Sequence, residues 1–177
     1  MGYSKLERNL IDLMKEEQAK LGYRKEAVRL YYPLSSLNHL FEAEDSVDAM
    51  QERLIHFPED MTAKLGMLTV THKGDRFCFR IPEEGSEYVH EHMGANEFIK
   101  ELVELLWQHG TTMEQIRALF DRHADGVICE NIDNGEFDYL LRFPESVGDP
   151  YYYCFKNEGC HIIYHIFLPE DYADFDF

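Results

Sequence analysis

The stretch Leu68-Thr69-Val70-Thr71-His72-Lys73-Gly74-Asp75-Arg76-Phe77-Cys78-Phe79-Arg80-Ile81 decides the fold class of this chain. Apolar and polar residues alternate on both sides of a Lys73-Gly74-Asp75 centre, which is the two-residue period of a strand with one buried face. The stretch therefore predicts a β-hairpin, with His72 on the apolar face near the turn. Upstream of it, apolar residues recur with the period of an α-helix, about 3.6 residues.

Helical spacing prevails before the hairpin and returns directly after it. Residues 4–21 carry a Ser4–Glu7 pair with capping-box spacing and are followed by Gly22, a natural helix stop. Short helices are expected around residues 37–41 and 47–54, the latter ending before Pro58. Two further helices are expected over residues 96–108 and 112–123. Residues 24–32 fit either a helix or a short strand.

The last third of the chain predicts two more hairpins. Asn134-Gly135 is a strong two-residue turn signal between residues 127–132 and 136–143, and this turn places Glu130 opposite Tyr139. Residues 151–156 and 160–168 flank a turn at residues 157–159. The run 160–168 is bulky on both faces, so we expect a central strand that is covered on both sides.

These elements together predict an α+β fold. The helical N-terminal two-thirds would pack on an antiparallel sheet built from about three β-hairpins. A length of 177 residues suits a single globular domain over residues 1–177. No run of about 20 apolar residues could span a bilayer and the first residues are charged, so we expect no membrane contact and a cytoplasmic location.

Charge is the strongest functional signal in the composition. The formal net charge is −17; residues 1–76 carry 11 Lys+Arg against 13 Asp+Glu, whereas residues 77–177 carry 6 against 21. A surface of this sign repels phosphate backbones, which argues against nucleic acid as a partner, and attracts basic proteins. Two helices of helix-turn-helix length are therefore better explained as an αα-hairpin that packs on the sheet.

Two histidines in the last hairpin are candidate ligand-binding residues. On a strand, His161 and His165 point the same way but lie about 13 Å apart, too far to share one metal ion. They could instead line a pocket with Tyr151 and Tyr153, or be satisfied interior histidines. The four cysteines have no C-x-x-C spacing and are expected to be reduced and mostly buried. No metal and no cofactor is therefore predicted.

Two other positions carry weaker signals. Glu130, if it lies beside Tyr139 on an apolar face, would be a half-buried carboxylate and a general-acid candidate, or would pair with an arginine. His90 and His92 would share a face of a strand and could chelate a metal if a third ligand approached, but their surroundings read as an acidic loop. Standard catalytic motifs are absent from the sequence.

Three segments carry a resemblance to a known family: residues 21–34 (LGYRKEAVRLYYPL), residues 135–139 (GEFDY) and residues 151–154 (YYYC). The chain resembles a small family of uncharacterised bacterial proteins of similar length, classed as a domain of unknown function. The resemblance covers nearly the whole chain. It implies a bacterial cytosolic protein and carries over no activity, cofactor or catalytic residue.

Two functions from different classes follow from these observations. The first is a non-enzymatic binding or regulatory protein, such as an immunity-type inhibitor, whose acidic, aromatic-bearing surface engages a basic partner. The alternative is an enzyme or small-molecule-binding protein with a Tyr/His-lined pocket at the C-terminal hairpin. A structural subunit of a larger assembly is a third possibility, and the oligomeric state is left open.

Overall fold

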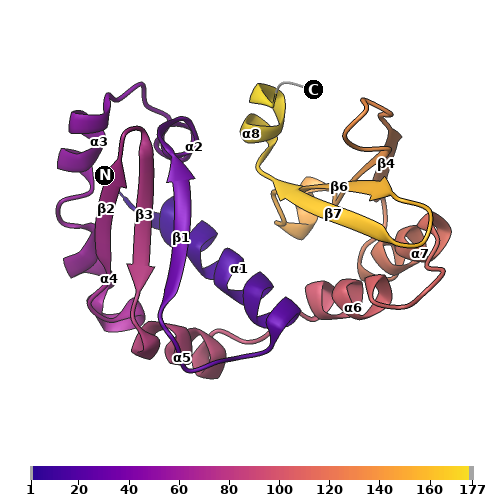
Figure 1. Cartoon of the computed structure of the whole chain (residues 1–177), viewed down its shortest axis with the longest axis horizontal. Helices are drawn as coiled ribbons and strands as arrows, with labels where there is room; N and C mark the ends of the chain where they lie inside the picture. Colours follow the sequence, from indigo (N-terminus) through magenta and orange to yellow (C-terminus); the bar gives the residue numbers. More distant parts are fainter. Residues whose placement is uncertain (1, 176–177) are drawn as a thin grey trace. The chain divides into compact units, whose positions relative to one another are not determined.

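The structure, a computed structural model, describes residues 2–175 and contains two antiparallel sheets (Figure 1). The chain divides into two compact units, Met1–Asn96 and Glu97–Phe177, each with one sheet. The α+β class is thereby confirmed, whereas the expectation of one antiparallel sheet was wrong, because the strands form two separate sheets. The single domain expected over residues 1–177 stays a prediction, and each unit is described by itself.

The first unit is built around a three-stranded sheet of order β1-β3-β2, in which β1 and β2 are the edge strands. Its elements in chain order are α1 (Ser4–Leu21), β1 (Val28–Pro33), α2 (Leu34–Phe41), α3 (Val47–Arg53), α4 (Phe57–Leu65), β2 (Thr69–Lys73), β3 (Arg76–Ile81) and α5 (Glu83–His92). Residues 24–32, for which helix and strand were both open, end in strand β1.

The hairpin expected over residues 68–81 is confirmed as β2 and β3. Gly74 has a positive φ of 59°, which a two-residue hairpin turn requires, and the register pairs Val70 with Phe79 and His72 with Phe77. His72 therefore shares a face with the core phenylalanines, as the alternation predicts. That inner face packs on helices α1 and α4. The Tyr32 hydroxyl donates a 2.5 Å hydrogen bond to Asn9 Oδ1 of α1, and Phe57 of α4 makes an edge-on contact with Phe79.

Two local expectations in this unit were wrong. Helix α1 begins at Ser4 with Tyr3 as its N-cap and no side-chain cap, so the Ser4–Glu7 capping box does not form, although Gly22 ends the helix with a φ of 75° as expected. Helix α4 was missed because Pro58 was taken only as a boundary. Proline is well suited to the first turn of a helix, since its missing N–H has no partner to lose there.

The second unit holds a four-stranded sheet of order β4-β5-β6-β7. Its elements are α6 (Glu97–Leu106), α7 (Met113–His123), β4 (Ile128–Asn131), β5 (Tyr139–Arg142), the 3-10 turn η1 (Glu145–Val147), β6 (Tyr152–Asn157), β7 (Ile162–Phe167) and α8 (Pro169–Asp174). Both expected helices are confirmed, and Thr112 and Gln115 form a complete capping box at the start of α7. Phe98 of α6 and Phe120 of α7 meet the Tyr153 ring at 5.5 and 5.3 Å between centroids.

The expectation of a central strand at residues 160–168 was wrong. Strand β7 is an edge of the sheet, and β5 and β6 are the inner strands. Its bulky residues still cover both faces, because Tyr164 stacks on Phe155 and Phe167 contacts Tyr172 of α8 on the opposite side. Bulk on both faces indicates that both faces are covered, and it does not reveal how many neighbouring strands there are. Helices are also not confined to the first two-thirds of the chain, since α8 follows the last strand.

The register of the β4–β5 hairpin also differs from the expected one. Asn131 pairs with Tyr139 and Glu130 pairs with Leu140, one residue away from the pairing that a two-residue turn would give. The side chain of Asn134 accepts hydrogen bonds from the backbone N–H groups of two following residues, which widens the loop. Glu130 is consequently exposed and does not lie half-buried beside Tyr139.

Candidate functional site

The tyrosines and histidines singled out at the last hairpin do not converge. Tyr153 is 1% exposed, faces helices α6 and α7, and donates its hydroxyl to Asp149 Oδ2 at 2.8 Å. His165 pairs with Cys154, the neighbour of Tyr153, so it lies on the opposite face of the sheet, where its ring meets that of Phe137 at 5.5 Å. Tyr153 and His165 therefore share no pocket wall.

The other two members of this group lie outside the sheet strands. Tyr151 precedes β6 and is half-buried, with its backbone N–H donating to Asp149 Oδ1 at 2.9 Å. His161 lies at the hairpin turn, with Nε2 2.9 Å from a carboxylate oxygen of Glu158 and Nδ1 3.1 Å from Cys160 Sγ. Within the described part of the chain, the side-chain polar contacts of His161 are with these turn neighbours, and none is with Tyr151, Tyr153 or His165.

The cysteines fall into two environments. Cys154 is fully buried, and burial raises the pKa of its thiol to about 12. Cys160 is exposed at the hairpin turn, and Cys78 and Cys129 are half-buried. The four thiols are free, as expected, but the expectation that most of them are buried was wrong.

The pair His90 and His92 lies in helix α5 instead of the loop or strand that was considered. On a helix, positions two apart point about 200° away from each other, so the two rings do not share a face. The His90 ring stacks on Tyr23 at 4.1 Å and the His92 ring stacks on Tyr88 at 4.6 Å between centroids. Within residues 2–175, no group of three His, Cys, Asp or Glu side chains is arranged to hold a metal ion.

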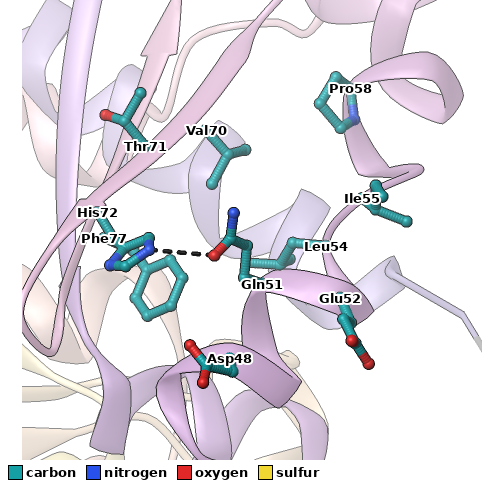
Figure 2. Close-up of a pocket in the computed structure, with 10 residues that line it drawn as sticks. All are labelled: Asp48, Gln51, Glu52, Leu54, Ile55, Pro58, Val70, Thr71, His72 and Phe77. Carbon is teal, nitrogen blue, oxygen red and sulfur yellow. Dashed lines mark hydrogen bonds between the residues drawn. The ribbon is translucent and has the colours of Figure 1, made fainter.

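A cleft of about 730 Å³ opens in the first unit, between strand β2 and the segment that joins α3 to α4 (Figure 2). Apolar side chains form much of its floor, and polar and acidic side chains of α3 stand at its rim. Its lining residues are Asp48, Gln51, Glu52, Leu54, Ile55, Pro58, Val70, Thr71, His72 and Phe77.

The floor and the rim of this cleft differ in chemistry. Leu54 and Phe77 are buried beneath it, whereas Ile55 is 66% exposed, which is unusual for so apolar a side chain. Asp48 and Glu52 are both exposed on α3 and bring two negative charges to the rim. The cleft therefore offers an apolar surface beneath a negative border.

Strand β2 adds backbone hydrogen-bonding groups to the cleft. In an antiparallel hairpin, alternate residues direct their N–H and C=O groups toward the partner strand, and the residues between them direct theirs away. The two-residue turn closes on the Lys73–Arg76 pair, so Thr71 bonds β3 whereas Val70 and His72 face the free edge. The bond from Leu34 N–H to Asp75 O, 2.7 Å, fits the same alternation, because it assigns Phe77 and Phe79 to strand β1.

The edge-facing backbone groups of Val70 and His72 have no backbone partner among residues 2–175 outside the sheet. A side-chain contact crosses the cleft, because His72 Nε2 lies 3.1 Å from Gln51 Oε1 of α3. The other ring nitrogen, His72 Nδ1, lies 3.2 Å from the carbonyl oxygen of Gly74 in the adjoining turn. An exposed strand edge is a template for pairing with another extended chain. The cleft thus combines an open β-edge, an apolar floor and an acidic rim.

The sequence signalled only part of this site. Alternation placed His72 on the apolar face of the hairpin, but nothing in the local pattern indicated that α3 and α4 would stand beside β2. A usable signal was Ile55, an apolar residue in the short break between two helices, where solvent exposure is expected.

The fold and the cleft define an α+β protein with two antiparallel sheets and an open sheet edge. A family model described as "Domain of unknown function, E. rectale Gene description (DUF3877)" matches residues 3–175, so the chain belongs to this bacterial family. The resemblance stated from the sequence is thereby confirmed. No curated protein and no solved structure matches the chain. None of the helices within residues 2–175 has the length and apolar character needed to cross a membrane.

Proposed function

We propose that this protein is a non-enzymatic binding protein of the bacterial cytoplasm, and that it engages a basic partner through the cleft beside β2. The partner segment would be extended and would add a strand to the free edge of the sheet. The observation that carries the proposal is the coincidence, in one cleft, of the edge-facing backbone groups of Val70 and His72 with the carboxylates of Asp48 and Glu52.

The backbone geometry sets the form of the ligand. Val70 and His72 each offer one N–H donor and one C=O acceptor, spaced two residues apart, which is the spacing at which a strand pairs with another strand. Main-chain hydrogen bonds of this kind supply affinity in strand addition, whereas pockets for alternate side chains supply specificity. The apolar floor at Ile55 would take one set of side chains of the partner.

Charge determines which extended segments bind. Lysine or arginine is favoured among the partner side chains that approach Asp48 and Glu52. The formal net charge of the chain is −17, which would speed the approach of a basic partner and slow that of an acidic one at low salt. The expected signature is an association rate that falls as salt is added.

A direct test uses a synthetic peptide of about ten residues that alternates lysine and valine, titrated into the isotopically labelled protein. We expect the largest amide chemical-shift changes at Val70 and His72, with weaker binding as salt rises. A matched peptide with glutamate in place of lysine should not bind. Equal binding of both peptides, or shifts confined to other elements, would refute the proposal.

The alternative of a Tyr/His-lined pocket at the C-terminal hairpin gains no support from the geometry, because Tyr153 and His165 lie on opposite faces of the sheet. The small-molecule function stays a prediction, and these residues do not form a pocket for it.

A further inference from the structure

The outer face of the first sheet is basic, in a protein whose net charge is −17. Strand alternation and the register place nine side chains on this face, opposite to the core: Arg29, Tyr31, Pro33, Thr69, Thr71, Lys73, Arg76, Cys78 and Arg80. Four of them are cations and none is an acid. All but Cys78, which is half-buried, are exposed.

The four cations of this basic sheet face have no carboxylate partner among the described residues 2–175. None of the three arginines forms an ion pair within that range, and Lys73 forms none there either. Most other basic side chains of the first unit do form ion pairs. The contact that Arg76 does make is with an aromatic ring, since its guanidinium carbon lies 4.7 Å from the centroid of Tyr31. Their positive charge is therefore available to a ligand.

The cations are arranged in two rows. Lys73 lies directly opposite Arg76, and Arg80 lies directly opposite Arg29, so like charges face one another across strands. Such pairs destabilise a sheet unless an anion lies between them. The two rows are four residues apart along β3, about 13 Å, and Tyr31 lies between them.

A hollow of about 380 Å³ marks one row of this face. Its lining includes Tyr31, Thr71, Lys73 and Arg76. Arginine and lysine bind phosphate through charge-assisted hydrogen bonds, and a threonine hydroxyl can donate one more. A planar ring can stack on an aromatic side chain or on an arginine guanidinium, and the Tyr31–Arg76 pair offers both surfaces.

We propose that the basic sheet face binds a nucleotide. Its phosphate would lie between Lys73 and Arg76, with the Thr71 hydroxyl as a further donor and the base against the Tyr31–Arg76 pair. An acidic peptide would satisfy the cations but would leave the aromatic platform unused. The net charge of the chain does not exclude this site, because surface charges more than about 8 Å away are largely screened at physiological salt.

Thr71 and His72 line both this hollow and the cleft, but the cations Lys73 and Arg76 line the hollow alone, so substitutions of these two test this site separately from the cleft function proposed above. The test is calorimetric titration at low salt with inorganic phosphate, AMP, a single-stranded RNA of about ten nucleotides and a polyglutamate peptide. The variant is Lys73→Ala with Arg76→Ala. The matched control is Lys100→Ala with Arg117→Ala, which removes the same charge from two exposed positions of the second unit.

We expect AMP to bind the wild-type protein and the control alike, and to bind the Lys73/Arg76 variant at least about tenfold more weakly. Tyr31→Val should weaken AMP binding but leave phosphate binding unchanged. If RNA binds more tightly than AMP, the ligand is a nucleotide within an RNA chain. If AMP binds more tightly than RNA, the ligand is a free nucleotide. Both results support the proposal. The variant should still bind the lysine-valine peptide.

Three results would overturn the proposal. They are the absence of binding of AMP and RNA, equal AMP affinity of the Lys73/Arg76 variant and the control, and binding of polyglutamate in preference to either nucleotide probe. Misfolding of the variant is tested separately by thermal unfolding. Removing the opposed Lys73–Arg76 pair should leave the melting temperature unchanged or raise it, because like charges across a strand pair are unfavourable.

Discussion

The ring of His72 and the side-chain amide of Gln51 meet at 3.1 Å between Nε2 and Oε1, and this contact links strand β2 to helix α3 across the cleft (Figure 2). His72 thus contributes to the cleft twice, through its ring and through its edge-facing backbone. The contact keeps α3 beside the strand while the backbone groups of Val70 and His72 stay open to a partner.

The assignment of the free edge predicts that proline destabilises the protein to very different extents at two adjacent positions. Val70→Pro removes an N–H that faces the cleft, so the free energy of unfolding should fall by about 1 kcal/mol or less. Thr71→Pro removes an N–H that bonds β3 and should cost about 3 kcal/mol. Urea unfolding of the two variants measures the difference, and equal losses would show that the edge is assigned wrongly.

The acidic rim predicts a charge-specific loss of peptide binding. Asp48→Asn combined with Glu52→Gln should weaken binding of the lysine-valine peptide several-fold, mainly by slowing association, because the local attraction is removed. Glu44→Gln combined with Glu91→Gln removes two exposed charges elsewhere in the same unit and serves as the control. Stopped-flow association rates distinguish the two; equal rates for both variants would locate the attraction outside the cleft.

The close packing around Gly85, in the first turn of helix α5, predicts that a substitution there is destabilising. A Cβ atom at this position would lie 2.4 Å from the Leu65 carbonyl oxygen and 2.6 Å from Ile81 Cγ2. Alanine is the better helix former by about 1 kcal/mol, yet the clash with backbone should lower the unfolding free energy by about 1–3 kcal/mol. The exposed neighbour Glu84→Ala should change stability little; a Gly85→Ala protein as stable as the wild type would contradict this packing.

Much of the fold could be predicted because its signals are local. The alternation in β2 and β3, the capping box of Thr112 and Gln115, and the helix stop at Gly22 all depend on neighbouring residues. Strand order is set by packing between distant segments, which is why β7 was wrongly expected at the centre of its sheet. The cleft depends on the same long-range arrangement, and the basic sheet face does so in part, since Arg29 joins the hairpin cations Lys73, Arg76 and Arg80 only in the folded sheet.

The carboxylate of Asp138 predicts that the stability of the second unit against unfolding depends on pH. The backbone N–H of Asn157 at 2.8 Å, together with Lys156 at 3.0 Å, holds the pKa of Asp138 below its usual value of 3.8. The pKa of Asp138 is therefore lower in the folded protein than in the unfolded chain. Its contribution to stability is complete at pH values above the unfolded pKa and is lost as the pH falls through the folded pKa.

Asp138→Asn should therefore cost about 1–2 kcal/mol at neutral pH and flatten the decline of stability below about pH 4. Glu136→Gln, an exposed change in the same hairpin, is the control. Urea unfolding between neutral and acidic pH measures both slopes. A variant that keeps the wild-type slope would show that Asp138 does not govern this transition.

The most direct measurement is amide hydrogen exchange at Val70 and His72, with and without the lysine-valine peptide. In the free protein these two amides should exchange rapidly while the amide of Thr71 is protected, because only Thr71 bonds β3. Addition of the peptide should slow exchange at Val70 and His72 together. Protection of both amides in the free protein, or no change on peptide binding, would contradict strand addition at this edge.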